Sequence, residues 1–161
     1  MNRLAIMSYL FAPVVLLLAA LAGCGHTTIA AGSHDTHEVE DDVELATIMG
    51  EMQRHSMKLG YAINAQNQRL AEFYLHEVEE TLEEIKAVRE HDGLPIGHIA
   101  GVIVNPALPP LDNAIEAGDW TAANKAYQGL IEACNNCHTA TQHEFIVILP
   151  ATGTPPFNQK F

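Results

Sequence analysis

The chain has 161 residues, which is enough for one domain with short appendages and too few for two domains of ordinary size. Its 20 acidic residues outnumber its 8 Lys and Arg residues and give a formal net charge of -12. Because a surface of this charge repels a phosphate backbone, the composition excludes nucleic acid as a partner.

The N-terminal 23 residues have the pattern of an export signal. Met1-Asn2-Arg3 is a short basic segment, and residues 4–22 are nearly all apolar. The apolar run ends in Leu21-Ala22-Gly23-Cys24, which resembles the lipobox at which bacterial lipoprotein signal peptides are cut. The resemblance implies that Cys24 is lipidated and anchors the chain to a membrane on the periplasmic side of the cell envelope. An uncleaved transmembrane anchor is the alternative, since about 19 apolar residues can just span a bilayer.

Residues 24–40 are predicted to be a flexible tether. They consist of Gly, Ser, Thr, Ala, His and acidic residues with no hydrophobic period. His26, His34 and His37 lie in this segment. Because dispersed histidines in a mobile arm are usually solvated, we assign them no role.

Residues 41–143 are predicted to form one helical domain. A first helix should begin around Asp41, where acidic residues complement the helix dipole. Its core positions follow three and four residue steps, at Leu45, Ile48, Met52, His55, Leu59 and Ala62. A turn near Asn67 should separate it from a second helix over about Gln68–Glu90. The acidic outer face of that second helix is typical of a solvated surface, so it predicts no hydrolytic site.

The third helix is predicted to be split. His91–Pro95 has the composition of a turn, and Ile96–Val104 that of a short apolar helix. The prolines of Asn105–Pro110 then interrupt the helix, because proline lacks the N–H donor and disfavours a helical residue before it. Leu111–Ala117 should complete this helix.

The fourth helix is predicted to start around Asp119, because Gly118 suits the end of the preceding element and Asp119 suits an N-cap. Alternating three and four residue steps then connect Trp120, Ala123, Tyr127, Leu130, Cys134, Cys137 and Thr141. This spacing indicates a buried helical seam. Both cysteines of the seam should therefore face the core.

The segment Cys134-Asn135-Asn136-Cys137-His138 is a C-x-x-C-H motif. Two thiols at this spacing can add to the two vinyl groups of one haem, and the adjacent imidazole can bind the iron. The motif predicts one covalent haem c attached to Cys134 and Cys137, with His138 as the proximal ligand. Such attachment occurs outside the cytoplasmic membrane, in agreement with the export signal.

Three other interpretations of the motif are weaker. A thioredoxin-like dithiol should open a helix after a strand, whereas this motif lies late in a helix. A zinc site could draw on Cys134, Cys137, His138 and His143, but the neighbouring Cys137 and His138 are poorly placed to chelate one tetrahedral ion. A buried cysteine pair beside an incidental histidine is the third interpretation.

Four amphipathic helices with C-x-x-C-H late in the last one resemble the cytochrome c prime type of four-helix bundle. The resemblance covers about residues 41–143 and implies an all-α, antiparallel four-helix bundle with haem near the end of the last helix. In six-coordinate bundle cytochromes the distal ligand is a methionine near the start of the first helix, and Met49 matches that placement. Met52, His55 or an open distal position are the alternatives.

The expected function is one-electron transfer to an unidentified redox partner protein, without enzymatic activity. Binding or sensing of a small gas, nitric oxide or carbon monoxide, is the alternative and requires an open distal position. Peroxidase chemistry would need a polar distal group, for which His55 is the first-helix candidate.

Residues 144–161 begin with the apolar Phe145–Leu149 and are predicted to be an extended tail over the bundle, at the haem edge. Whether the tail also forms a homodimer contact is a question that the sequence leaves open.

Overall fold

The computed structural model describes residues 36–161, and the side chains from Glu44 onward. This part of the chain contains helices and connecting segments without a strand, which confirms the predicted all-α class. The export signal, the lipidation candidate Cys24 and the histidines His26 and His34 lie outside the described residues. Within residues 36–161, no helix combines the length and apolar character needed to cross a membrane.

The first two helices are α1 (Thr36–Asn64) and α2 (Gln68–Ala87). α1 begins before the predicted start at Asp41, because no Gly or Pro interrupts the sequence between Thr36 and Met49. The predicted tether 24–40 is corrected accordingly, since its last five positions, 36–40, are helical. The turn before α2 is closed by Asn67, whose side chain accepts a hydrogen bond from the Leu70 N–H at 3.3 Å.

The third part of the domain is split, as its prolines predict. It consists of α3 (Ile96–Ile103), the short 3-10 helix η1 (Asn105–Ala107) and α4 (Leu108–Glu116). Pro109 and Pro110 lie in the first turn of α4, where a missing N–H breaks no helical hydrogen bond.

The start of α3 packs closely against the end of α2. α2 ends at Ala87, earlier than the predicted Glu90. The Gly97 N–H donates to the Val88 carbonyl at 2.9 Å, and a Cβ at Gly97 would collide with the Lys86 carbonyl. Glycine is therefore required at this approach.

The last helix, α5 (Trp120–Ala140), carries the C-x-x-C-H motif in its final turns. The Asp119 side chain caps α5 by accepting a hydrogen bond from the Ala122 N–H at 3.0 Å. Gly118 has φ +65°, a conformation that suits glycine at the end of α4. The predicted seam faces inward, and Ala123, Tyr127, Leu130, Cys137 and Thr141 are all buried.

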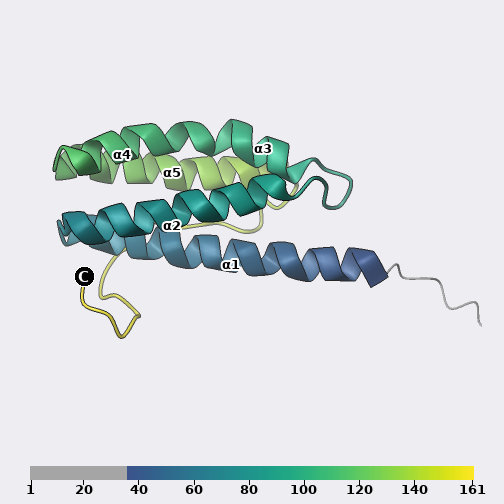
Figure 1. The fold of residues 1–161 in the computed structure, drawn as a ribbon, viewed down its shortest axis with the longest axis horizontal. Coiled ribbons are helices and arrows are strands. Elements are labelled where there is room, and N and C mark those ends of the chain that lie inside the picture. Colours follow the sequence, from purple (N-terminus) through teal and green to yellow (C-terminus); the bar gives the residue numbers. More distant parts are fainter. Residues whose placement is uncertain (1–35) are drawn as a thin grey trace, which may run out of the picture. The chain divides into compact units, whose positions relative to one another are not determined.

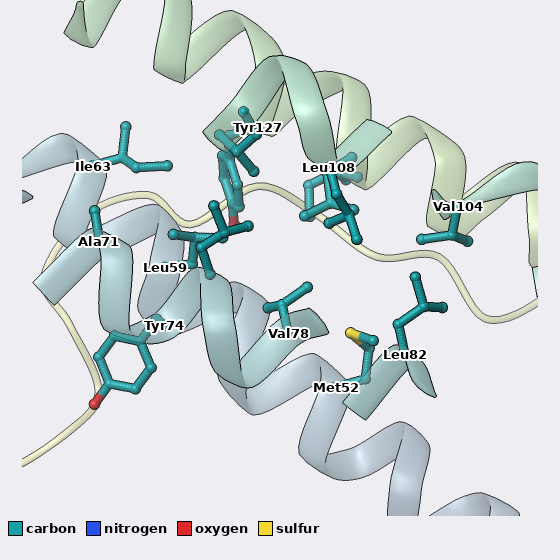
Figure 2. Close-up of a cluster of buried hydrophobic side chains, with 14 of the residues drawn as sticks. Met52, Leu59, Ile63, Ala71, Tyr74, Val78, Leu82, Val104, Leu108 and Tyr127 are labelled. Atoms are coloured by element: carbon teal, nitrogen blue, oxygen red, sulfur yellow. The ribbon is translucent and has the colours of Figure 1, made fainter. Parts of the chain in front are cut away.

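Figure 1 shows the helices lying along one another, and their buried side chains form one hydrophobic core. α1 contacts α2 and α5, α4 contacts α2 and α5, and α3 contacts α2 and α5. Side chains of α1, α2, α4 and α5, together with Val104, meet in the cluster shown in Figure 2. The largest fully buried side chains are Leu59, Ile63, Val78, Leu82, Leu111, Ile115 and Leu130.

The residues after α5 form an extended tail that follows the helices back toward the α1–α2 turn (Figure 1). The Ala151 N–H donates to the Tyr127 hydroxyl at 3.2 Å, and the Tyr61 hydroxyl donates to the Thr152 carbonyl at 3.0 Å. The Tyr74 hydroxyl donates to Gln159 Oε1 at 2.7 Å. Tyrosines of three helices thus hold the tail against the domain.

Candidate functional site

A cavity of about 510 Å³ lies between the helices and the tail. Pockets of roughly 300–1,000 Å³ are typical of cofactor and small-molecule sites. Its walls come from α1 (Leu45, Ala46, Met49, Gly50, Met52, Gln53, Ser56), α2 (Leu82, Ile85), α3 (Ile96, Ala100), α5 (Cys134, Cys137, His138) and the connecting segments and tail (His91, Val104, Thr141, His143, Ile146, Ile148). Most of these side chains are apolar, so the cavity suits a large hydrophobic group.

All three chemically active side chains of the motif line this cavity. Cys137 is buried, and Cys134 and His138 are half-buried. Cys134 and His138 are separated by one helical turn on α5, and Cys137 lies between them. The two thiols and the imidazole are therefore presented to the same space.

The ring of His138 is oriented by the tail. His138 Nδ1 lies 2.8 Å from the Ile146 carbonyl oxygen. Because a carbonyl can only accept, Nδ1 carries the proton and donates this hydrogen bond. The lone pair is then on Nε2, and metal-binding histidines are commonly held in this way by a backbone carbonyl.

The surroundings of both thiols favour the neutral, protonated form. Burial, together with the neighbouring Cys137, raises the pKa of Cys134 to about 11. Burial also raises the pKa of Cys137. Redox-active dithiols instead have a thiol whose pKa is lowered, so these pKa shifts disfavour a thioredoxin-like role.

The tail forms one wall of the cavity through alternating side chains. Ile146 and Ile148 line the cavity, although Ile146 is also 43% exposed, whereas Phe145, Val147 and Leu149 are exposed and do not line it. An extended backbone directs successive side chains to opposite sides, which explains the alternation. The tail thus lies against the helices at this cavity, and its location at a haem edge stays a prediction.

The wall contributed by α1 contains both methionines that the sequence proposes as distal ligands. Met49 is half-buried and Met52 is buried, and both line the cavity. Gly50 also lines it, and a Cβ at Gly50 would meet no other atom within 4 Å. A side chain added at Gly50 would therefore extend into open space.

His55, the other proposed distal group, does not line the cavity. Its Nδ1 lies 3.1 Å from Thr81 Oγ1, and its Nε2 lies 3.8 Å from Glu77 Oε2. The Thr81 hydroxyl already donates to the Glu77 carbonyl at 2.7 Å, so it accepts from His55. His55 is thereby held between α1 and α2, and these contacts disfavour its proposed role as distal ligand or peroxidase acid.

Two cavity histidines have no assigned role in the sequence-based haem site. His91 and His143 line the cavity from the α2–α3 loop and from the segment after α5. Among the described residues, the cluster with the geometry of a metal site is His91, Asp92 and His143, without either cysteine of the zinc alternative. Sequence spacing gives no signal for this cluster, because its members come from distant parts of the chain.

Comparison with protein-family models, with curated proteins and with solved structures finds no significant match for this chain. A functional assignment therefore depends on the motif and on the geometry of the cavity. Both concern the same three side chains of α5.

Proposed function

We propose that the chain is a c-type cytochrome that transfers single electrons at one covalently attached haem. The observation that carries this proposal is that Cys134, Cys137 and His138 line one apolar cavity of about 510 Å³. Haem c supplies reversible one-electron redox chemistry when it is bound. The proposed role needs no catalytic residue of the protein.

Each residue of the motif has a distinct role in this proposal. Cys134 and Cys137 form the thioether bonds, and His138 provides the proximal ligand through Nε2. The Ile146 carbonyl holds the His138 ring through the 2.8 Å hydrogen bond to Nδ1. Apolar walls limit the access of water, which favours a small reorganisation when the charge of the site changes.

Met49 is proposed as the distal ligand. It lines the cavity from the first helix and is half-buried, so its thioether has room to move toward a bound group. Gly50 beside it leaves space for close approach. Met52 lies one turn further along the same face and is the alternative.

The proposed fold family is the cytochrome c prime type of antiparallel four-helix bundle. α1, α2, α5 and the split segment α3–η1–α4 correspond to its four helices. The contacts of α1 with α2 and α5, and of α4 with α5, support this arrangement. The lipobox resemblance adds a lipid anchor at Cys24 and a location on the periplasmic side of the cell envelope. Electron transfer requires a redox partner protein, and the tail leaves the question of a homodimer open.

Gas binding is the second candidate function. The observation that favours it is that the α1 wall of the cavity offers no histidine, since His55 is held by Thr81. If neither methionine binds the iron, this apolar wall provides the surroundings in which nitric oxide or carbon monoxide binds. The spectrum of the oxidised iron separates the two functions.

Mass spectrometry of the denatured, mature protein tests the proposal. We expect one haem to remain attached, and we expect Cys134→Ser combined with Cys137→Ser to abolish attachment. Cys24→Ser is the matched control, because it removes the third cysteine and should leave the haem in place. A mature protein with the mass of the bare polypeptide would contradict the proposal.

A further inference from the structure

Two histidines and one carboxylate converge at the edge of the cavity. His91 and Asp92 belong to the loop between α2 and α3, and His143 follows α5. One ligand atom from each of the three residues lies within 4.8 Å of the other two. The distance between His91 Nε2 and Asp92 Oδ2 is 3.7 Å. Two ligand atoms of a tetrahedral zinc ion are about 3.4 Å apart, so small side-chain rotations bring the cluster to metal-binding geometry.

The backbone holds these ligands in place. The N–H of His91 donates to the Leu94 carbonyl at 3.0 Å, and the N–H of Leu94 donates back to the His91 carbonyl at 3.0 Å. On the other side, the His143 N–H donates to the His138 carbonyl at 2.7 Å, and the His143 carbonyl accepts from the Ile146 N–H at 2.9 Å. Both ligand-bearing segments are thus fixed before any ion binds, which lowers the entropy cost of binding.

The tautomer of His143 also suits a metal ligand. Its Nδ1 lies 2.7 Å from the Thr141 carbonyl oxygen and therefore carries the proton. Nε2 then has the lone pair, and the carbonyl provides the outer hydrogen bond that orients metal-binding histidines. The side chain of His91 is 11% exposed and that of Asp92 is 70% exposed, so an ion here would remain accessible from solvent.

We propose that His91, Asp92 and His143 form a second metal site, which binds a divalent transition-metal ion such as Zn²⁺. Two imidazoles and one carboxylate are typical ligands of such ions, whereas Ca²⁺ and Mg²⁺ prefer oxygen ligands alone. Water completes the coordination. The ion connects the α2–α3 loop to the segment after α5, and thereby closes one edge of the cavity.

The ligands of this site are distinct from Cys134, Cys137 and His138, although His91 and His143 line the same cavity. Negative charge favours the binding of a cation here. Asp92 contributes one negative charge to the site, and the whole chain carries a formal charge of -12. The ion would bind both segments at once, at the place where the ring centroids of His91 and His143 lie 6.3 Å apart. Binding should therefore stabilise the folded protein by linkage.

Competition with a chromophoric zinc chelator tests the site on the mature protein. The titration uses a background in which His26, His34 and His37 are replaced by Gln, so that the N-terminal segment contributes no imidazole. We expect one Zn²⁺ per chain. Because the loss of a single outer hydrogen bond already costs roughly tenfold to 100-fold, His91→Ala and His143→Ala should each weaken binding at least about tenfold.

Asp92→Asn and His76→Ala provide the matched comparisons. Asp92 is exposed, so Asp92→Asn should weaken Zn²⁺ binding while leaving the helical circular dichroism spectrum unchanged. His76 lies on the exposed face of α2 beside Glu80, at 3.3 Å, and His76→Ala should bind Zn²⁺ as the background protein does. In the background protein Zn²⁺ should raise the melting temperature, and in His143→Ala it should not. Equal affinity in the background protein and in His143→Ala or Asp92→Asn would overturn the proposal.

Discussion

The side chain of Asn135 forms two hydrogen bonds with the backbone of Ile148. Asn135 Oδ1 accepts from the Ile148 N–H at 2.8 Å, and Asn135 Nδ2 donates to the Ile148 carbonyl at 3.0 Å. Asn135 is the first residue between the two cysteines of the motif. One variable position of C-x-x-C-H therefore holds the tail wall of the cavity through a paired contact that resembles strand pairing.

Asn135→Ala should release this part of the tail. Both backbone groups of Ile148 lose their partner, which should lower the free energy of unfolding by about 1–3 kcal/mol. Hydrogen exchange of the Ile148 amide should become faster, because its N–H is no longer held. Urea unfolding and amide exchange measure the two effects. Asn136→Ala is the matched control, because Asn136 is the exposed neighbour within the same motif. Equal effects of the two substitutions would argue against a specific role of Asn135.

Gly60 allows the Tyr127 ring to pack against α1. A Cβ at Gly60 would lie 2.5 Å from the Tyr127 hydroxyl oxygen, and that hydroxyl accepts a hydrogen bond from the Ala151 N–H. Gly60→Ala should therefore displace the ring and lower the free energy of unfolding by about 1–3 kcal/mol.

Gly129→Ala is the control for this substitution. A Cβ at Gly129 would meet no other atom within 4 Å, so the change should stabilise α5 by about 0.5–1 kcal/mol through helix propensity. Thermal unfolding of both variants measures the two opposite signs. A stabilising Gly60→Ala would show that Tyr127 moves without cost.

The raised pKa of the half-buried Cys134 predicts a loss of stability at alkaline pH in haem-free protein. Its pKa is raised to about 11 by burial, whereas an unfolded cysteine has a pKa of about 8.5. Between these pH values the unfolded state binds fewer protons than the folded state, so the free energy of unfolding falls as pH rises. Urea unfolding at about pH 8 and about pH 10 measures the slope. Cys134→Ala should reduce this slope, and an unchanged slope in that variant would contradict the assignment.

Local signals in the sequence were sufficient for much of the fold. The caps at Asn67 and Asp119, and the prolines before Leu111, act on their own neighbours, so the element order could be predicted. The seam of α5 also predicted that Cys137 is buried.

Contacts between distant segments could not be predicted. His55 belongs to the apolar seam of α1, but periodicity does not specify which neighbour it meets, and Thr81 of α2 holds it away from the cavity. Likewise, no sequence spacing brings His91 and His143 together, because their proximity depends on how the α2–α3 loop meets the end of α5. The sequence could therefore predict the site residues on α5, but it could not predict which residues of the other helices and loops lie beside them.

Met49 and Met52 should differ in what they contribute. Both line the cavity, but Met52 is buried in the core, whereas Met49 is half-buried (Figure 2 shows Met52 beside Leu82). Met52→Ala removes core packing and should lower the free energy of unfolding by about 2–5 kcal/mol. Met49→Ala should cost less stability, because less of its side chain is removed from water.

If Met49 binds the iron, the oxidised protein should be low-spin and should show a sulfur-to-iron charge-transfer band. Met49→Ala should abolish that band, convert the iron to high-spin and lower the reduction potential, because a thioether ligand favours the reduced state. Met52→Ala should keep the band despite its larger effect on unfolding, so the optical spectrum separates ligation from packing. A native protein that is already high-spin, and whose spectrum shifts readily on addition of carbon monoxide or nitric oxide, would contradict ligation by Met49 and favour the gas-binding function.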